Sequence, residues 1–296
     1  MPMRIIRQKA KLQAQTRDWR RSGETIGVVL TMGALHDGHL SLVRAALARA
    51  DRVIVTVFVN PRQFNNPEDL ENYPRTEESD ARTLAPLKID TLYVPAPEEI
   101  YPSGFSTTVS VSGVSDGLCG GDRPGHFDGV ATVVTKLLLQ TDADYTFFGD
   151  KDYQQLQVVR RVANDLDLKT EIVACPTVRE EDGLAMSSRN LRLGSGARAT
   201  APVLGRVLES AANVIGRGGN VSQALETAHQ ALLVAGFDKV DYFEVRSDPG
   251  LLAIETADQP ARLFAAAWLN GVRLIDNLPI PVLTQTTNSA QLCEPA

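Results

Sequence analysis

Short apolar runs alternate with amphipathic stretches through the first 175 residues of the chain. The apolar runs predict strands at residues 26–30, 53–59, 91–94, 145–148 and 171–174. The amphipathic stretches predict helices at residues 40–50, 77–87, 130–139 and 154–166. A run such as VIVTVFV is apolar almost throughout, which is typical of a strand buried on both faces of a parallel sheet. The alternation therefore predicts a Rossmann-like, doubly wound α/β domain.

The pattern changes from about residue 184 onward. Two Ala-rich patterns predict helices at residues 200–214 and 221–235. Three strand patterns follow them, at residues 240–245, 262–268 and 272–275. Helices followed by clustered strands predict a smaller α+β domain. We therefore expect two domains, 1–184 and 185–296, with a polar and frayed tail after Pro281.

Composition narrows the class of protein without identifying it. Of the 296 residues, 43% are hydrophobic and 22% are charged, which is ordinary for a soluble globular protein. The net charge of −6 argues against a surface built to hold nucleic acid. Cys119, Cys175 and Cys293 form no CxxC pair, and no run is long and apolar enough to span a membrane. We expect a cytoplasmic protein with neither nucleic acid nor membrane as a partner.

The motif TMGALHDGH, residues 31–39, lies between the first predicted strand and the next predicted helix. The carboxyl end of a parallel strand opens at the usual ligand crevice, and a helix N-terminus there attracts anions. Gly33 and Gly38 permit tight turns or close approach of the backbone to a ligand. His36 and His39 are spaced so that both imidazoles can donate hydrogen bonds to one phosphate. The motif predicts a polyphosphate site.

By pattern alone, two alternatives stay open for these histidines. They can be ordinary surface residues of a Gly-containing turn, because short motifs often match by accident. A zinc site is the weaker alternative, since the other histidines are His126 and His229 and no cysteine lies at ligand spacing.

The His-x-Gly-His of the first motif resembles the signature of the nucleotidylyltransferase superfamily. In that superfamily a second motif, much later in the sequence, closes over the phosphates, and MSSR at residues 186–189 resembles it in position. Ser187 and Ser188 offer hydroxyl donors, and Arg189 offers a forked guanidinium suited to phosphate. Alone, Ser-Ser-Arg is usually a solvated loop. Together, the two motifs indicate a nucleotide enzyme.

Three more segments carry candidate chemistry. FVNPRQFNNPEDLENYPRT, residues 58–76, is either a plain surface loop or an active-site cover in which Gln63 supplies an amide. DRPGHFDGV places Arg123 and His126 just before an apolar helix, where anions bind. FFGDKDYQQL places a lysine, an aspartate and a glutamine at the start of the next helix, namely Lys151, Asp152 and Gln155.

In order and spacing, seven motifs resemble the pantoate–β-alanine ligase family: TMGALHDGH, FVNPRQF, YPRT, RPGHFDGV, FGDKDYQQ, DGLAMSSRN and RLIDN. The resemblance reaches both expected domains. The chain departs from the commonest form at Asp150, where a glutamate is usual, so that the carboxylate is one methylene shorter.

The resemblance implies a role for each matching residue. His39 would be the catalytic acid, supported by His36 and Lys151. The implied ATP site comprises Met32, Gly33, His36, Gly38, His39, Gly149, Asp150, Lys151, Asp152, Val178, Met186, Ser187, Ser188 and Arg189. Pantoate and β-alanine would contact Gln63, Tyr73, Arg123, His126 and Gln155. Asp80 is a weaker candidate contact for Mg²⁺, and the family suggests a homodimer.

The implied reaction has two steps. The pantoate carboxylate attacks the α-phosphorus of ATP, which acts as a substrate with Mg²⁺, and diphosphate leaves. The β-alanine amine then attacks the pantoyl adenylate and releases AMP. No covalent enzyme intermediate and no tightly bound organic cofactor are needed. Three alternatives remain: a nucleotidylyltransferase that keeps the nucleotide on its product, a tRNA synthetase, disfavoured by the absence of a basic extension, and a non-catalytic nucleotide sensor.

Overall fold

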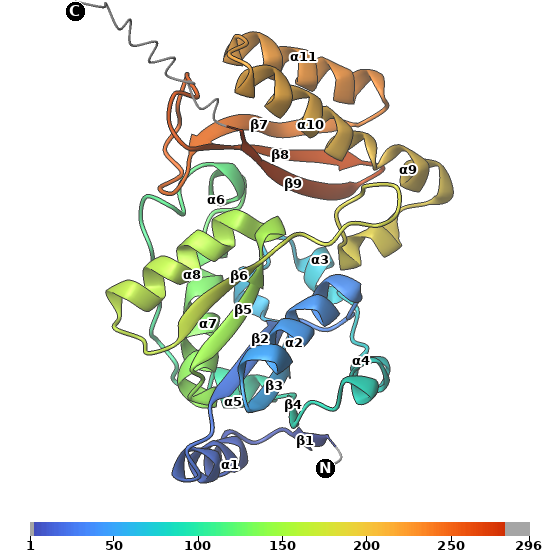
Figure 1. Cartoon of the computed structure of the whole chain (residues 1–296). Helices are drawn as coiled ribbons and strands as arrows, with labels where there is room; N and C mark the ends of the chain where they lie inside the picture. Colours follow the sequence, from blue (N-terminus) through green and yellow to red (C-terminus); the bar gives the residue numbers. More distant parts are fainter. Residues whose placement is uncertain (1–2, 282–296) are drawn as a thin grey trace, which may run out of the picture.

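The computed structural model describes residues 3–281 and holds two separate sheets (Figure 1). The first sheet has six strands: β1 (Arg4–Ile6), β2 (Ile26–Thr31), β3 (Arg52–Val57), β4 (Thr91–Tyr93), β5 (Tyr145–Gly149) and β6 (Glu171–Cys175). Their order is β1-β4-β3-β2-β5-β6, and all neighbouring pairs are parallel. The expectation for the tail lies outside the described residues, as does Cys293.

The strand order makes the sheet doubly wound. From β2 the chain first moves outward through β3 and β4, and it later returns to place β5 on the other side of β2. The carboxyl ends of β2 and β5 therefore meet at the switch point where ligands bind in such sheets. The predicted α/β class with a parallel sheet is confirmed.

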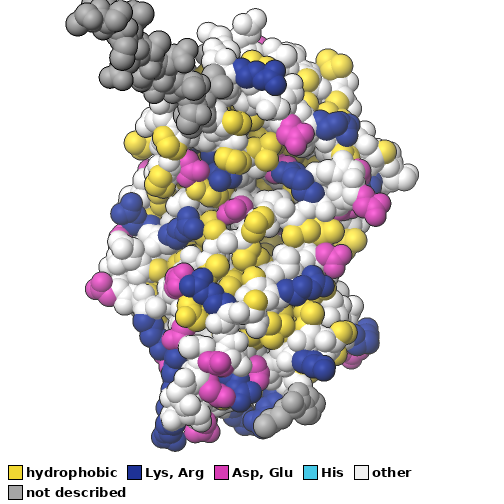
Figure 2. Space-filling view, viewed as in Figure 1, with side chains coloured by type: hydrophobic (Ala, Val, Ile, Leu, Met, Phe, Trp, Pro, Cys, Tyr) yellow, Lys and Arg dark blue, Asp and Glu magenta, His cyan; other side chains and the backbone are white. Residues whose placement is uncertain are grey.

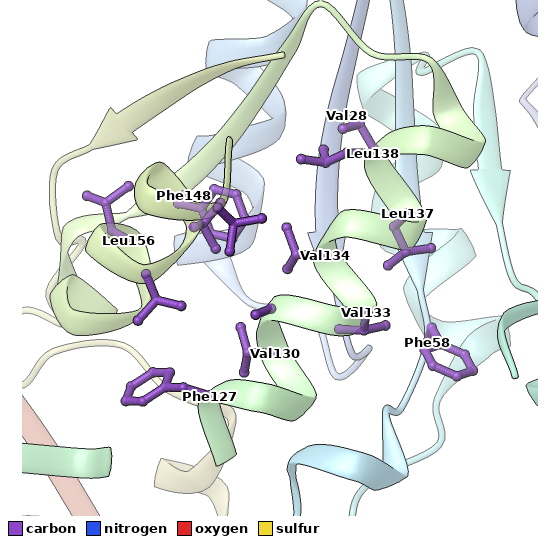
Figure 3. Close-up of a cluster of buried hydrophobic side chains, with 14 of the residues drawn as sticks. Val28, Phe58, Phe127, Val130, Val133, Val134, Leu137, Leu138, Phe148 and Leu156 are labelled. Atoms are coloured by element: carbon purple, nitrogen blue, oxygen red, sulfur yellow. The ribbon is translucent and has the colours of Figure 1, made fainter. Parts of the chain in front are cut away.

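Helices cover both faces of this sheet, and side chains of the strands alternate between the two layers. The helices are α1 (Lys9–Arg21), α2 (Asp37–Arg49), α4 (Glu77–Leu84), α7 (His126–Thr141) and α8 (Tyr153–Asp165). Val28 and Ile54 pack with α7 and α8, whereas Val29 and Val55 pack with α2 and α4. In Figure 3, α7 presents side chains such as Val130 and Val134 toward the strands and α8. Burial on both faces explains the unbroken apolar strands.

Short helices line the loops that leave the carboxyl edge. They are η1 (Pro61–Gln63), α3 (Pro67–Glu71), α5 (Pro97–Ile100), α6 (Leu118–Asp122), η3 (Asp150–Asp152) and η4 (Ser188–Arg192), whereas η2 (Ala85–Leu87) lies between α4 and the amino end of β4. In η1 and α3, proline occupies the first helical position, and the preceding asparagine, Asn60 or Asn66, accepts a backbone N–H. The segment 58–76 is therefore largely built from capped turns.

The second sheet is antiparallel and has the order β7-β8-β9, with β7 (Lys239–Ser247), β8 (Ala261–Leu269) and β9 (Val272–Ile280). Three helices precede it: α9 (Ser195–Thr200), α10 (Val203–Gly216) and α11 (Val221–Val234). Figure 1 shows α10 and α11 on the side of this sheet that faces away from the six-stranded sheet. Its other side faces the carboxyl edge of the larger sheet, so β9 lies close to η3 and η4.

Several helices and strands were not predicted from the hydrophobic pattern, or were predicted too short. It did not predict β1 or α1, because β1 is an exposed three-residue edge strand and α1 buries only Leu12 and Thr16. Helices α2 and α7 begin three and four residues before their apolar periodicity, at Asp37 and His126, because their first turns face a cavity. The helix expected at 200–214 is α10, which spans Val203–Gly216, and the short helix α9 before it was not predicted.

Charged side chains of both signs are interspersed over the face shown in Figure 2. Among residues 3–281, no helix combines the length and apolar character that a membrane crossing requires.

Candidate functional site

A cavity of about 240 Å³ opens at the switch point, where the loops after β2 and β5 meet. The predicted ATP-site residues that line it are Met32, His36, Gly38, His39, Gly149, Lys151, Asp152, Val178, Met186, Ser187, Ser188 and Arg189. All five predicted substrate residues line it as well: Gln63, Tyr73, Arg123, His126 and Gln155. Gly33, Asp80 and Asp150 are outside the lining. Residues far apart in the sequence thus meet in one cavity.

The two histidines of the first motif lie against each other at the start of α2. The backbone N–H of His36 donates to Nδ1 of His39 at 3.3 Å, and their ring centroids are 4.1 Å apart. Because Nδ1 accepts, the neutral His39 ring carries its proton on Nε2. A Cβ on Gly38 would lie 2.9 Å from the His36 ring, so only glycine allows this imidazole to pack there. The spacing of the motif is thus explained.

Both imidazoles are held neutral. Burial, then the charge of Lys151, lowers the pKa of His36, and burial, then His36, lowers the pKa of His39 to about 3. A neutral imidazole donates one hydrogen bond without adding a fixed charge. The pair can therefore serve as hydrogen-bond donors to an anion across the neutral pH range.

Asp80 holds the loop of the first motif through hydrogen bonds to its backbone. Its 2% exposed carboxylate accepts the backbone N–H of Ala34 at 3.1 Å and of Leu35 at 2.9 Å, and the Thr76 hydroxyl at 3.0 Å. Gly33, with φ +87°, carries the loop past this carboxylate. The expected Mg²⁺ contact of Asp80 gains no support, because both oxygens are engaged inside the protein and outside the cavity lining.

Lys151 enters the cavity from η3, directly after β5. Its side chain is 16% exposed, and its ammonium lies 3.8 Å from the Asp152 carboxylate, a loose pairing. Gln155, one turn further along in α8, lines the same cavity. Its neighbour Gln154 instead accepts the Cys119 N–H of α6 at 3.0 Å and donates to the Gly117 carbonyl, in the loop before α6, at 3.1 Å.

The Ser-Ser-Arg segment is delivered by a small hairpin. Arg179 and Ala185 form an antiparallel bridge, and Met186 N–H donates to the Val178 carbonyl at 3.0 Å. Arg189 then reaches Asp69 of α3, with 3.4 Å between its Nη2 and Oδ2 of the carboxylate. The predicted phosphate-binding arginine thus pairs with the segment 58–76.

The predicted substrate residues form a hydrogen-bonded group. Asn60, which the pattern did not single out, is 1% exposed and donates from Nδ2 to Gln63 Oε1 at 3.0 Å, which leaves the Gln63 NH₂ free to donate. His126 Nδ1 donates to the Gln63 carbonyl at 2.8 Å, and Arg123 donates to the same carbonyl at 3.2 Å. Burial, then the charge of Arg123, lowers the pKa of His126 to about 4. The signal available in the sequence for Asn60 was an asparagine directly before a proline, a common helix-capping pair.

A second, larger cavity of about 510 Å³ lies between the two sheets. The two cavities share the lining residues Arg123, His126, Lys151, Asp152, Gln155, Ser187 and Arg189. The shared residues make one continuous cleft, wide enough for more than a nucleotide phosphate. Among residues 3–281, no group of three or more His, Cys, Asp or Glu side chains could hold a metal by itself.

Fold and site together define an α/β protein whose cavity at the switch point of a doubly wound sheet is lined by groups suited to a phosphate-bearing ligand. Within that class, the chain belongs to the family described as pantoate-β-alanine ligase, whose model matches residues 4–279.

Named relatives agree with this family. The pantothenate synthetase of Chelativorans sp. (strain BNC1) is 61% identical over 280 residues, which is 95% of this chain and 99% of the relative. That of Roseobacter denitrificans is 59% identical over 282 residues, 95% of this chain and 99% of the relative.

Solved structures share the fold. The pantothenate synthetase of Thermus thermophilus aligns with a TM-score of 0.88 at 43% identity, covering 94% of this chain and 99% of its own. A pantoate-β-alanine ligase from Francisella tularensis, solved with β-γ ATP and β-alanine, aligns with a TM-score of 0.80 at 35% identity, covering 94% and 97%.

Proposed function

We propose that this protein condenses pantoate with β-alanine at the expense of ATP, releasing AMP and diphosphate through a pantoyl adenylate. One observation carries the proposal: His36, His39, Lys151 and the segment 186–189 come from three distant parts of the chain and line a single cavity at the switch point. The named ligands of the F. tularensis relative support ATP and β-alanine as the substrates.

The first step needs charge neutralised around the α-phosphate. The pantoate carboxylate oxygen attacks the α-phosphorus, and the bond to diphosphate breaks. Neutral His39 would donate its Nε2–H to a phosphate oxygen, while the ammonium of Lys151 supplies the positive charge. Ser187, Ser188 and Arg189 would hold the leaving diphosphate, so Arg189 must release Asp69. With the pKa of His39 near 3, it acts as a hydrogen-bond donor rather than as an imidazolium acid.

The second step needs the amine held near the adenylate carbonyl. The neutral β-alanine amine attacks that carbon, AMP leaves with the bonding electron pair, and the amine loses a proton. Gln63 and Gln155 would orient pantoate, and Gln63 would also meet β-alanine. The Arg123 guanidinium has no carboxylate partner within residues 3–281 and suits the β-alanine carboxylate.

Mg²⁺ is proposed as a partner of the ATP phosphates. Asp152 is the acidic residue among those that line the smaller cavity, beside Lys151, and is the fitting protein contact in place of Asp80. Mg²⁺ usually keeps several waters and takes one or two carboxylates plus phosphate oxygens, so this small set is sufficient. When bound, the ion would neutralise phosphate charge.

A direct assay tests the proposal. Purified protein is incubated with ATP, Mg²⁺, pantoate and β-alanine, and AMP and pantothenate are measured. Omitting β-alanine should still leave pantoate-dependent exchange of diphosphate into ATP. A product that keeps the nucleotidyl group would indicate a nucleotidylyltransferase, and tight ATP binding without turnover would indicate a sensor.

We further propose a homodimer in the cytoplasm, and a domain boundary near residue 184. The boundary is supported by the second hydrophobic cluster, whose buried residues run from Leu184 to Ile280. Size-exclusion chromatography with light scattering tests the dimer, and expression of residues 1–184 alone tests the boundary.

A further inference from the structure

The motif RLIDN at residues 273–277 has no part in the proposed chemistry, yet it ends in two buried polar residues on β9. Asp276 and Asn277 are each 4% exposed. Buried polar groups are costly unless they are hydrogen-bonded, so their partners identify their role. Their partners include two segments of the candidate phosphate site: η3 with Lys151, called the Lys151 arm below, and the hairpin leading to residues 186–189, called the Ser-Ser-Arg arm.

Asn277 contacts the Lys151 arm. Its Nδ2 donates to the carbonyl oxygens of Asp150 and Lys151, each at 2.9 Å. Its Oδ1 accepts Nη1 of Arg262 at 2.7 Å, and that guanidinium stacks 3.8 Å from the Tyr153 ring centroid. Since Arg262 can only donate, the amide orientation is fixed with Nδ2 toward η3. The backbone that carries Lys151 is thus tied to the second sheet.

Asp276 contacts the other arm. Its carboxylate pairs with Arg179 through two bonds of 2.6 and 3.0 Å. Arg179 also donates to the Gly183 carbonyl at 3.0 Å, across the hairpin that leads to the segment 186–189. The carboxylate further accepts the backbone N–H of Asn277 at 2.8 Å. The two adjacent residues therefore fix both arms from one strand.

We infer that Asp276 and Asn277 are positioning residues that hold the Lys151 arm and the Ser-Ser-Arg arm at a fixed separation for adenylation. Neither residue need touch substrate. Displacement of a catalytic group by about 1 Å can cost on the order of 10²-fold in rate, and a two-residue brace on a separate sheet resists such displacement. The inference rests on the proposed function.

The test is a double-mutant cycle with Lys151. Asn277→Ala should lower pantoate-dependent ATP–diphosphate exchange about tenfold in the wild-type background. In a Lys151→Ala background, which is itself much slower, the same change should cost less than about twofold, because a brace is of no use without the group it positions. The KM for pantoate should stay within about twofold.

A second variant guards against simple unfolding. Asn277→Asp keeps the size of the side chain and the acceptor for Arg262 but loses both bonds donated to η3, so it should reproduce the loss of exchange. A melting temperature that stays above the assay temperature shows that the variant is folded when it is assayed. On the other arm, Asp276→Asn should be similarly non-additive with Arg189→Ala.

Asp241→Asn is the matched control. Asp241 is also buried, with a side chain 5% exposed, but it pairs with Lys239 and Arg273 inside the second sheet. Any factor by which Asp241→Asn lowers the exchange rate should be the same in the wild-type and Lys151→Ala backgrounds.

The possible outcomes separate cleanly. Wild-type protein without exchange activity overturns the proposed function itself. Active wild type in which Asn277→Ala and Asn277→Asp have no effect, or lose the same factor in the Lys151→Ala background, overturns the brace alone.

Discussion

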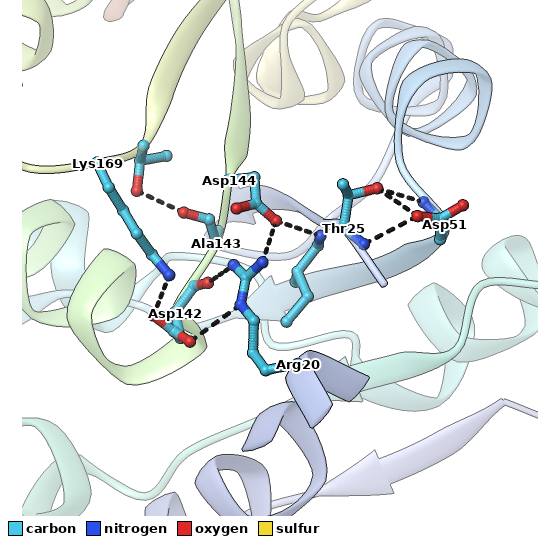
Figure 4. Close-up of polar contacts among 9 residues, drawn as sticks. Arg20, Thr25, Asp51, Asp142, Ala143, Asp144 and Lys169 are labelled. Atoms are coloured by element: carbon cyan, nitrogen blue, oxygen red, sulfur yellow. Dashed lines mark hydrogen bonds and ion pairs between the residues drawn. The ribbon is translucent and has the colours of Figure 1, made fainter. Parts of the chain in front are cut away.

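The two edges of the six-stranded sheet use the same kinds of side chain for opposite purposes. At the amino edge, Arg20 donates to Asp144 at 2.6 Å and to Asp142 at 3.1 Å, and the Asp144 carboxylate also accepts the Ile26 N–H at 2.7 Å (Figure 4). Nearby, Asp51 accepts the backbone and the hydroxyl of Thr25. Each donor there meets a protein acceptor.

At the carboxyl edge the donors are only partly used. Lys151 has a single loose pairing at 3.8 Å, and the His39 Nε2 has no assigned partner in the described part of the chain. Burial here lowers the pKa of both histidines of the first motif instead of pairing them with acids. Polar groups that are satisfied within the protein thus join the strands, whereas buried donors without a protein acceptor mark the place where a ligand would bind.

The largest expected effect is a loss of activity on changing a donor at the carboxyl edge. His39→Ala should lower the rate of ATP–diphosphate exchange by about 10²–10³, the usual loss for one donor to a developing charge. His229→Ala, on α11 and outside both cavities, is the control and should remain fully active. An exchange rate equal to wild type in His39→Ala would remove this residue from the chemistry.

The next expected effect is on how the stability of the protein depends on pH. The pKa of His126 is about 4 in the folded protein and about 6.5 when unfolded, so the unfolded state binds the proton first as pH falls. The stability this group contributes is present above pH 6.5 and is lost toward pH 4. Between pH 7 and 4.5, the free energy of unfolding of His126→Gln should fall by about 2 kcal/mol less than that of the wild type, as measured by urea unfolding. Parallel pH curves would show that His126 titrates normally.

At the amino edge, Arg20→Ala should destabilise without touching catalysis. Removing the guanidinium leaves two partly exposed carboxylates without this partner, so we expect a loss of about 1–2 kcal/mol in the free energy of unfolding. Arg20→Lys should recover part of it. The KM values should be unchanged, and a large rise in KM for ATP would mean that the two edges are coupled.

The smallest effect is expected at the pairing of Arg189 with Asp69, which also pairs with Arg192 at 2.7 Å. Asp69→Asn frees Arg189 for phosphate, so the KM for ATP should fall about two- to threefold, since a long contact of 3.4 Å between partly buried groups contributes little energy. Glu71→Gln in the same helix should leave it unchanged. An increase in KM would show that Asp69 supports Arg189 rather than competing with the nucleotide.

Local patterns were sufficient for the interior of the fold but not for its edges. The strand at 26–30 was predictable because its residues are buried on both faces and so are uniformly apolar. Helix α7 was predicted only from residue 130, since its first turn, with His126, faces the cavity and follows no apolar period. Polar positions whose partners are distant in the chain carry no local signal.

By itself, the sequence determined the class of sheet and the presence of phosphate-suited motifs at helix starts, because both follow from the order of side chains along one segment. Only the tertiary structure decided that Asp80 holds a loop and that Asn60 orients Gln63. It also decided that the end of RLIDN, in the second sheet, braces Lys151. Hydrogen bonds depend on positions in space, and residues more than a hundred apart become neighbours only after the strands have paired.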